Sequence, residues 1–217
     1  AGFKWVSPEL ELNDIGFLRS ADDITQFVNL SYRTIKPVSI FRDLKVRLSQ
    51  FSKSDFEGNH NRLQYDLYGD IRFVNNWTLD FGAAYSPRNY MNTTLRGGPR
   101  WRISKNGYQY LFINSDKRKK FYTKLGAIIS QPKGNEFSFL KIEAELNYQP
   151  TNALNISIAP EYSSRPSKTQ YITQASYTNG TRYVLGTIDN QTFQASIRFD
   201  YTLNPNLSIQ YYGQPFV

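Results

Sequence analysis

The chain has 217 residues, a formal net charge of +8, one histidine and no cysteine. The lack of cysteine excludes disulfide scaffolds, thiol catalysis and cysteine-based metal centres. The basic residues are scattered rather than gathered in a stripe, which argues against a nucleic-acid partner. The longest apolar run covers only residues 125–129 and is too short for a membrane-spanning helix, but strands that cross a membrane alternate and need no such run.

Apolar and polar residues alternate with a period of two along most of the chain, first at residues 44–48 and then through 62–85. Side chains of a strand point alternately to opposite faces, so residues 62–85 predict a two-faced hairpin with a short turn at Asn75-Asn76. The same alternation recurs in residues 140–149, 154–159 and 193–202. No window shows a 3.6-residue repeat with helix caps, so the sequence predicts an all-β chain.

Strand lengths and connections favour a membrane barrel over a soluble sandwich. The predicted strands run for roughly ten to fourteen residues, and a tilted strand needs about 9–11 residues to cross a membrane. Short connections alternate with long ones, which is typical of outer-membrane barrels. The predicted short connections are residues 35–39, 75–76, 116–119, 150–152 and 204–206, and the long ones are 52–61, 87–107, 131–136 and 165–190.

In this interpretation one face of the strands contacts lipid and the other lines a wet lumen. In a soluble sandwich the same polar residues would face bulk water instead. The predicted lipid-facing residues are Leu63, Tyr65, Leu67, Ile71, Phe73, Leu79, Phe81, Leu140, Ile142, Leu146, Phe193, Ile197 and Phe199. The predicted lumen-facing charged residues are Arg62, Asp66, Asp70, Arg72, Lys141, Glu143, Glu145, Arg198 and Asp200. Aromatic residues toward strand ends suit an interfacial girdle: Trp77, Tyr85, Tyr148, Tyr162, Tyr201 and Tyr211.

Four strings in this order carry a family resemblance: residues 13–19 with Asp22, Arg-Gly-Gly-Pro at 96–99, residues 115–119, and residues 181–216. Together they resemble the C-terminal barrel of an uncharacterised Bacteroidota family that carries an N-terminal carbohydrate-binding module of the family-9 type. The resemblance implies one domain over residues 1–217, an antiparallel transmembrane outer-membrane β-barrel with ten to eleven strands visible. It also implies that the N-terminal module and the final strands are absent, so glycan binding transfers to no residue of this chain.

Three further candidate sites each have a structural alternative. His60 lies between two predicted strands near Ser52, Ser54, Asp55 and Glu57, where a barrel-rim hydrolase would need its base, but a solvated loop histidine is the favoured interpretation. Paired inward carboxylates suit glycoside hydrolysis, but charges of both signs also satisfy a polar lumen. The loop at Arg96, Gly97 and Gly98 has the composition to hold an anion with backbone N–H groups, although Gly-Gly-Pro also simply turns a loop.

The expected function is therefore non-enzymatic: a bacterial outer-membrane barrel that acts as an anchor or pore, or as a subunit of an envelope, uptake or secretion complex. The expected partners are outer-membrane lipid, lipopolysaccharide and other envelope proteins, with no nucleic acid, no cofactor and no metal. A porin-like channel for anionic or glycan-derived solutes is one alternative. A soluble β-sandwich that binds glycans is another.

Overall fold

A computed structural model describes residues 1–11, 21–91, 93–134 and 136–217. These residues form fourteen strands and no helix, and none of them belongs to a helix that could cross a membrane. The strands are β1 (Gly2–Val6), β2 (Asp23–Thr34), β3 (Phe41–Ser54), β4 (His60–Phe73), β5 (Thr78–Met91), β6 (Trp101–Ile103), β7 (Asn106–Asn114), β8 (Phe121–Pro132), β9 (Phe139–Thr151), β10 (Leu154–Ser164), β11 (Ser167–Tyr177), β12 (Gly180–Ile188), β13 (Gln191–Asn204) and β14 (Leu207–Gly213). The all-β prediction is confirmed.

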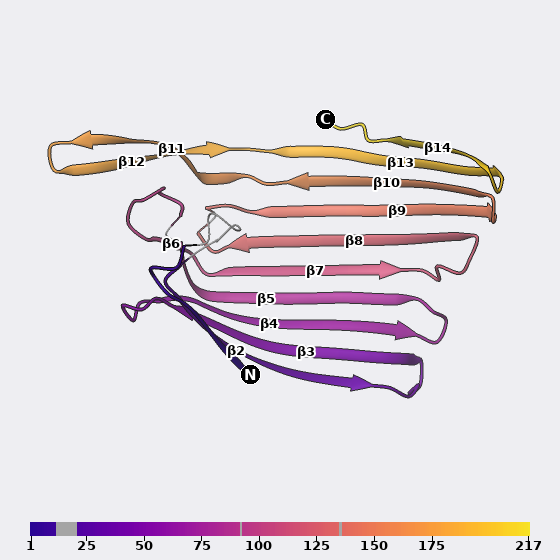
Figure 1. The fold of residues 1–217 in the computed structure, drawn as a ribbon, viewed down its shortest axis with the longest axis horizontal. Helices are drawn as coiled ribbons and strands as arrows, with labels where there is room; N and C mark the ends of the chain where they lie inside the picture. Colours follow the sequence, from indigo (N-terminus) through magenta and orange to yellow (C-terminus); the bar gives the residue numbers. More distant parts are fainter. Residues whose placement is uncertain (12–20, 92, 135) are drawn as a thin grey trace.

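One antiparallel sheet contains nearly all of these strands, in the order β1-β2-β3-β4-β5-β7-β8-β9-β10-β13-β14 (Figure 1). β6 pairs with the outer part of β5, and β11 and β12 form a separate two-stranded hairpin that projects from one end of the sheet. Apart from β6 and the β11–β12 hairpin, the order of the strands in the sheet is their order in the chain. This is the up-and-down arrangement expected from short local connections.

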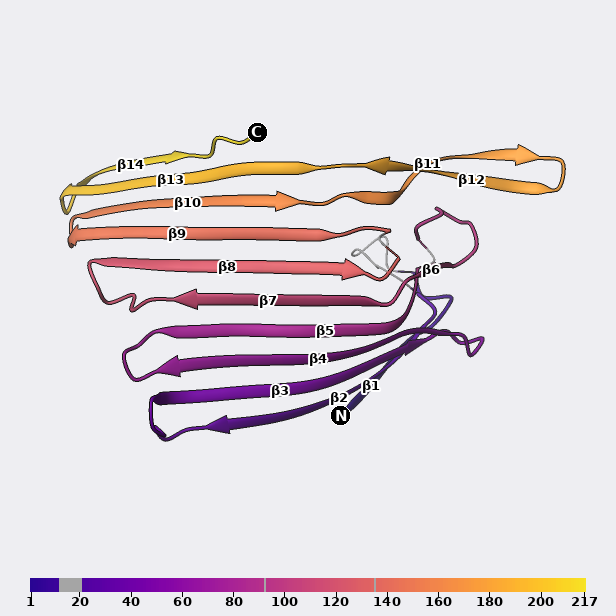
Figure 2. The ribbon, with the colours of Figure 1, turned by 180° about the vertical axis from the view of Figure 1, so that it is seen from behind.

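The two ends of the sheet differ in their connections, as both views show (Figures 1 and 2). At the turn end, the connections are residues 35–40, 74–77, 115–120, 152–153 and 205–206. At the loop end they include residues 92–105 and 165–190, beside the shorter 55–59 and 133–138. In the turn 74–77, Asn76 adopts a positive φ of 64°, a conformation that asparagine tolerates better than most residues.

Two of the predicted long connections are wrong in detail. Residues 52–61 are mostly strand, because β3 and β4 stay paired as far as Ser54 and His60 and only residues 55–59 turn. Residues 165–190 are not a polar loop but contain the β11–β12 hairpin. That hairpin turns at Thr178-Asn179, between Tyr177 and Gly180, which pair with each other, and Gly180 has a φ of 128°.

The sheet is a single layer with almost no interior. Its accessible surface is 15110 Å², whereas a compact monomer of this mass exposes about 10,000 Å². Prolines aside, Leu95 and Ile103 are the only large hydrophobic residues that are buried among the described residues. Apolar side chains in the middle of the sheet are open instead, with Ile142 52 % exposed and Ile158 43 % exposed. Domains normally bury apolar faces between two layers, and an exposed apolar face of this size is typical of a surface that another medium or molecule covers.

The sheet is also open at its edges. Among the described residues, no pairing joins β1 to β14, so the closed barrel predicted from the sequence is not formed by them. β1 pairs only with residues 23–27 of β2, which leaves one edge of residues 28–34 without a neighbouring strand in the described part of the chain. The fold of the described residues is therefore an open antiparallel sheet in which eleven strands are hydrogen-bonded side by side and β6 is paired with β5.

Candidate functional site

The strand register brings every predicted lipid-facing residue to one face of the sheet, here called the apolar face. Across the central strands, Ile71 lies opposite Leu79 and Leu79 opposite Ile113. Farther along, Ile142 pairs with Tyr162 and Tyr162 with Phe193. Since partners in a ladder point the same way, the face continues without interruption from β2 to β14. That these residues share a face is established, and their contact with lipid stays a prediction.

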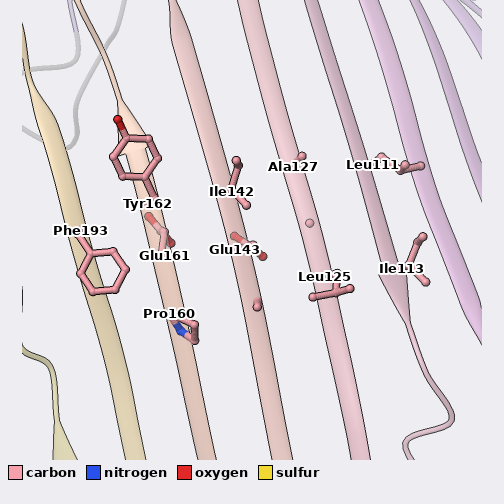
Figure 3. Close-up of a pocket in the computed structure, with 12 residues that line it drawn as sticks. Leu111, Ile113, Leu125, Ala127, Ile142, Glu143, Pro160, Glu161, Tyr162 and Phe193 are labelled. Atoms are coloured by element: carbon pink, nitrogen blue, oxygen red, sulfur yellow. The ribbon is translucent and has the colours of Figure 1, made fainter.

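A shallow hollow of about 470 Å³ lies on this apolar face over β7 to β13 (Figure 3). Its floor is made of small residues, including Ala127 and Pro160, and its sides of larger ones such as Leu125, Tyr162 and Phe193. The hollow is open and almost wholly apolar, so it offers dispersion contacts to a hydrocarbon chain and few hydrogen bonds to a polar ligand.

The apolar band does not fill the whole face. Toward the loop end, some positions on the same face carry polar side chains. Gln50 lies opposite Tyr65, Gln109 opposite Ala83, and Gln131 opposite Gly107. At the turn end of β8 the same face carries only a smaller polar side chain, Thr123, opposite Leu146. The apolar band is therefore displaced toward the turns, and the strands extend past it at the loop end.

The opposite face carries all nine predicted lumen-facing charges and is here called the polar face. Its best-defined group is a row of ion pairs across β8, β9 and β10. Lys124 Nζ lies 2.6 Å from Glu143 Oε1, and Lys141 Nζ lies 2.7 Å from Glu143 Oε2 and 2.9 Å from Glu161 Oε2. The two lysines thus satisfy the two glutamates, which is the arrangement that a polar but charge-balanced surface needs.

The remaining predicted charges are held in smaller groups on the same face. Arg72 lies 3.7 Å from Asp43, and Asn147 donates to Glu145 at 2.7 Å. The guanidinium of Arg198 lies 4.9 Å from the centre of the Tyr212 ring. Gln64 links Arg62 to Asp66 by accepting a hydrogen bond from the first and donating one to the second. In the strand ladder, Asp70 lies opposite Asp80 and Asp200 lies opposite Asn155. That these charges line a lumen stays a prediction.

Aromatic rings also lie on the polar face. Tyr68 of β4 and Tyr110 of β7 lie on either side of Gly82 of β5, with ring centroids 6.4 Å apart and planes 29° apart. A side chain at Gly82 would overlap the Tyr110 ring and approach the Tyr68 ring. The Phe112 ring covers Gly126 in the same way. Glycine thus allows these rings to lie over the sheet instead of standing away from it.

His60 is brought together with Ser52, as the hydrolase hypothesis requires, but in the wrong hydrogen-bonding arrangement. Ser52 Oγ lies 2.9 Å from His60 Nε2, and Arg88 Nη1 lies 2.9 Å from His60 Nδ1. A guanidinium can only donate, so Nδ1 accepts and the proton of the neutral ring is on Nε2, which donates to Ser52. A catalytic base needs the opposite, an Nε2 that accepts the serine proton and an acidic partner at Nδ1. The geometry therefore favours a structural role for His60.

The predicted anion-holding loop packs against the β11–β12 hairpin. The Arg96 guanidinium lies 5.1 Å from the centre of the Tyr171 ring, and a side chain at Gly98 would overlap the Tyr183 ring. The backbone N–H groups of Arg96 and Gly98 donate to carbonyls of the same loop. Arg96 and Gly97 both have positive φ. These contacts supply a structural reason for the motif, and anion binding by Arg96, Gly97 and Gly98 stays a prediction.

A polar cluster fixes this loop to the β3–β4 turn. Arg100 Nη1 donates to Asn61 at 2.8 Å, its Nη2 donates to Asn59 at 3.1 Å, and its guanidinium lies 4.0 Å from the Asp55 carboxylate. Burial raises the pKa of Asp55, but hydrogen bonds from Asn59 and Asn61 and the charge of Arg100 outweigh it and leave that pKa below its usual value.

A comparison with protein-family models matches residues 1–215 to one family, described as a domain of unknown function (DUF5916). The chain belongs to this family. The match covers all but the last two residues, so the family corresponds to the whole sheet together with its hairpin. No curated protein and no solved structure gives a significant match. The DUF5916 description names no activity, and a function must be argued from the geometry.

In this DUF5916 chain, sequence reasoning missed the aromatic residues of the polar face and the β11–β12 hairpin. The ring positions were detectable in part, because Tyr108, Tyr110 and Phe112 alternate in phase along β7. The glycines beneath the rings belong to neighbouring strands, so only the register reveals that pairing. The Asn179-Gly180 dipeptide, in contrast, is a direct hairpin signal that the sequence did contain.

Proposed function

We propose that the chain forms the wall of an integral β-barrel in the bacterial outer membrane, with its apolar face toward lipid and its polar face toward a wet lumen. One observation carries this proposal: a single-layer sheet presents an unbroken apolar face that no other part of the described chain covers. Lipid solves that problem without a second protein layer, and the paired charges of the other face suit water.

The dimensions of the apolar band support the proposal. In β13 the band runs from Phe193 to Tyr201, which is about 27 Å along a strand and about 21 Å along the membrane normal at a tilt near 40°. The outward apolar band of outer-membrane barrels is about 25 Å tall. Aromatic residues lie near both limits of the band, with Tyr148 and Tyr211 toward the turns and Tyr162 and Phe193 toward the loops.

The two unlike ends support one orientation. Outer-membrane barrels have tight turns on the periplasmic side and longer loops outside, where strands often extend beyond the membrane. Here the turn end would be periplasmic, and the loop end, with residues 92–105 and the β11–β12 hairpin, would face outward. Lipid would exclude unpaired backbone groups, so in the barrel the open edges of β2 and β14 would be paired with other strands.

The role that suits such a wall is that of an anchor or pore, or of a subunit in an envelope, uptake or secretion complex, with outer-membrane lipid, lipopolysaccharide and other envelope proteins as its partners. A channel for anionic or glycan-derived solutes is the more specific form of the pore. A Bacteroidota origin and an N-terminal family-9-type carbohydrate module are part of the same proposal and rest on the sequence resemblance. A hydrolase is disfavoured by the hydrogen bonds of His60.

A single-cysteine scan tests the proposal cleanly, because the chain has no cysteine of its own. Each residue from 62 to 73 is replaced in turn, labelled with a fluorophore, and exposed in vesicles to a quencher attached to lipid acyl chains. Quenching with a period of two, strong at Leu63, Tyr65 and Leu67, is the expected result. Uniform quenching, or a chain that is soluble and monomeric without detergent, would contradict the barrel.

Two copies packed through their apolar faces would also hide the apolar side chains, as in the sandwich alternative. The same scan separates the two arrangements. In a water-soluble pair, the labels on the apolar face would be protected from aqueous quenchers and would not respond to lipid-borne ones.

A further inference from the structure

We infer that Tyr68, Tyr108 and Tyr110 form a stacking site for a neutral pyranose ring on the polar face. The inference deepens the proposed pore and rests on this face being open to water. Tyr68 and Tyr110 supply a floor, because their rings lie side by side over Gly82 with planes only 29° apart. Tyr108 supplies a side wall, with its ring 6.1 Å from that of Tyr110 and inclined by 58°.

The main feature of this site is a pair of nearly parallel rings placed over one glycine. The two ring planes are within 29° of parallel, and Gly82, the β5 residue between them, has no side chain that could separate the rings. Gly82 makes this possible, since a side chain there would overlap the Tyr110 ring. The next residue on the same side of β5 is Ala84, opposite Tyr108, so the strand beneath the site carries no bulk.

The groups beside the floor are those that recognise hydroxyl groups. Asp70 and Asp80 face each other one ladder step toward the turns, and Asp66 lies one step toward the loops. Asp80 accepts from Asn114 at 3.3 Å and shares a hydrogen bond with Asp70, and Asp66 has Gln64 and Tyr68 as partners, so the remaining carboxylate lone pairs of the group can accept from a ligand. A pyranose offers slightly positive C–H groups on its ring face and hydroxyl donors at its rim, which match the negative ring faces and these acceptors.

The same surroundings disfavour other flat ligands. A nucleotide would bring its phosphate groups toward three carboxylates, and like charges in this position repel. A quaternary ammonium ion is favoured by a cage of rings that surrounds it, whereas two of the three rings here are nearly parallel and only Tyr108 is inclined to them. The site ends at Phe112, whose ring already has Lys124 Nζ 4.8 Å from its centre.

The test uses the chain in lipid nanodiscs and isothermal titration with three probes: the linear hexasaccharides of glucose joined by α-1,4, β-1,4 or β-1,3 bonds. Choline and adenosine monophosphate serve as competitors. We expect at least one hexasaccharide to bind and the competitors not to displace it. Tyr68→Leu and Tyr110→Leu should each weaken that binding about tenfold, because each removes one ring face. Tyr110→Phe keeps the ring and should leave it nearly unchanged.

Tyr65→Leu is the matched control, since it makes the same substitution in the same strand as Tyr68 but on the apolar face. If a leucine variant does not fold, saturation transfer from tyrosine ring protons to the sugar in the unsubstituted chain gives the same answer. No binding of any hexasaccharide, an equal loss in Tyr65→Leu, or displacement by choline would overturn the inference. The quenching scan above is measured on the same nanodiscs. Period-two quenching without sugar binding would contradict only the sugar site. Sugar binding without period-two quenching would contradict only the barrel.

Discussion

Placing a charge at the centre of the apolar band tests directly what that face touches. Ile158 is the middle residue of the apolar run of β10, between Leu154 and Tyr162, and it pairs with Leu146 and Ile197 on the neighbouring strands. Either end of the run is about 14 Å away along the strand, or about 10 Å along the membrane normal at a 40° tilt. The substitution Ile158→Lys therefore puts an ammonium group near the middle of the bilayer if the face contacts lipid.

The expected cost follows from this depth. A lysine on the lipid face of a barrel near the bilayer midplane destabilises the fold by about 2–4 kcal/mol, which lowers the folding constant about 30- to 900-fold. Ala159→Lys is the matched control, because the next residue faces the polar side, opposite Ser196 and between Ser157 and Glu161. We expect it to cost less than about 0.5 kcal/mol, as for an ordinary surface substitution.

The assay is a urea titration of folding into phospholipid vesicles, followed by the fluorescence of the three tryptophans and extrapolated linearly to zero denaturant. A difference of at least about 2 kcal/mol between the two lysine variants is expected. Equal stabilities within about 0.5 kcal/mol would refute the reasoning, because a residue that is 43 % exposed to water tolerates lysine without such a cost.

Three further predictions concern turns, charges and glycines. The hydrogen bond from Arg118 lowers the pKa of Asp116 to about 2. The stability that this carboxylate gives the turn should therefore be complete above about pH 4 and be lost as the pH falls through 2, which an NMR titration of the turn residues measures. In Asp116→Asn this contribution should be missing at every pH. Glu143→Gln removes the carboxylate partner of Lys124 and one of the two carboxylate partners of Lys141, and should cost about 1–3 kcal/mol in the same urea assay. A change below about 0.3 kcal/mol would contradict the ion-pair network. Gly126→Ala forces a side chain into the phenylalanine ring above it and should cost about 1–3 kcal/mol, whereas Gly107→Ala meets nothing closer than 4.0 Å and should cost less than about 0.5 kcal/mol.

These perturbations share one premise about how the chain is stabilised. An ordinary domain of this size derives most of its stability from a buried apolar core. This sheet has no such core in its described residues, and its ladder of backbone hydrogen bonds alone cannot offset the entropy of ordering long strands. The medium on the apolar face is therefore part of the folding reaction, and stabilities are meaningful only when that medium is stated.

The hydrolase hypothesis shows how far sequence reasoning reaches at a candidate site. The sequence places Ser52 and His60 near each other, and the structure does join them at 2.9 Å. The deciding group is Arg88, which is 28 residues away in the chain and reaches His60 only because β4 and β5 pair. A single long-range contact thus changes the hydrogen-bonding role of the histidine, and no local motif contains that information.

The sequence by itself determined the strand type, the two faces and most of the tight turns. These properties are local, because the direction of a side chain in a strand follows from its parity and a turn from a few residues such as Asn75-Asn76. Only the tertiary structure decided the neighbours across strands: Tyr68 and Tyr110 over Gly82, Lys141 between two glutamates, and an edge left open beside β2. Register joins residues far apart in the chain, and it depends on the pairing energy of whole strands rather than on any short segment.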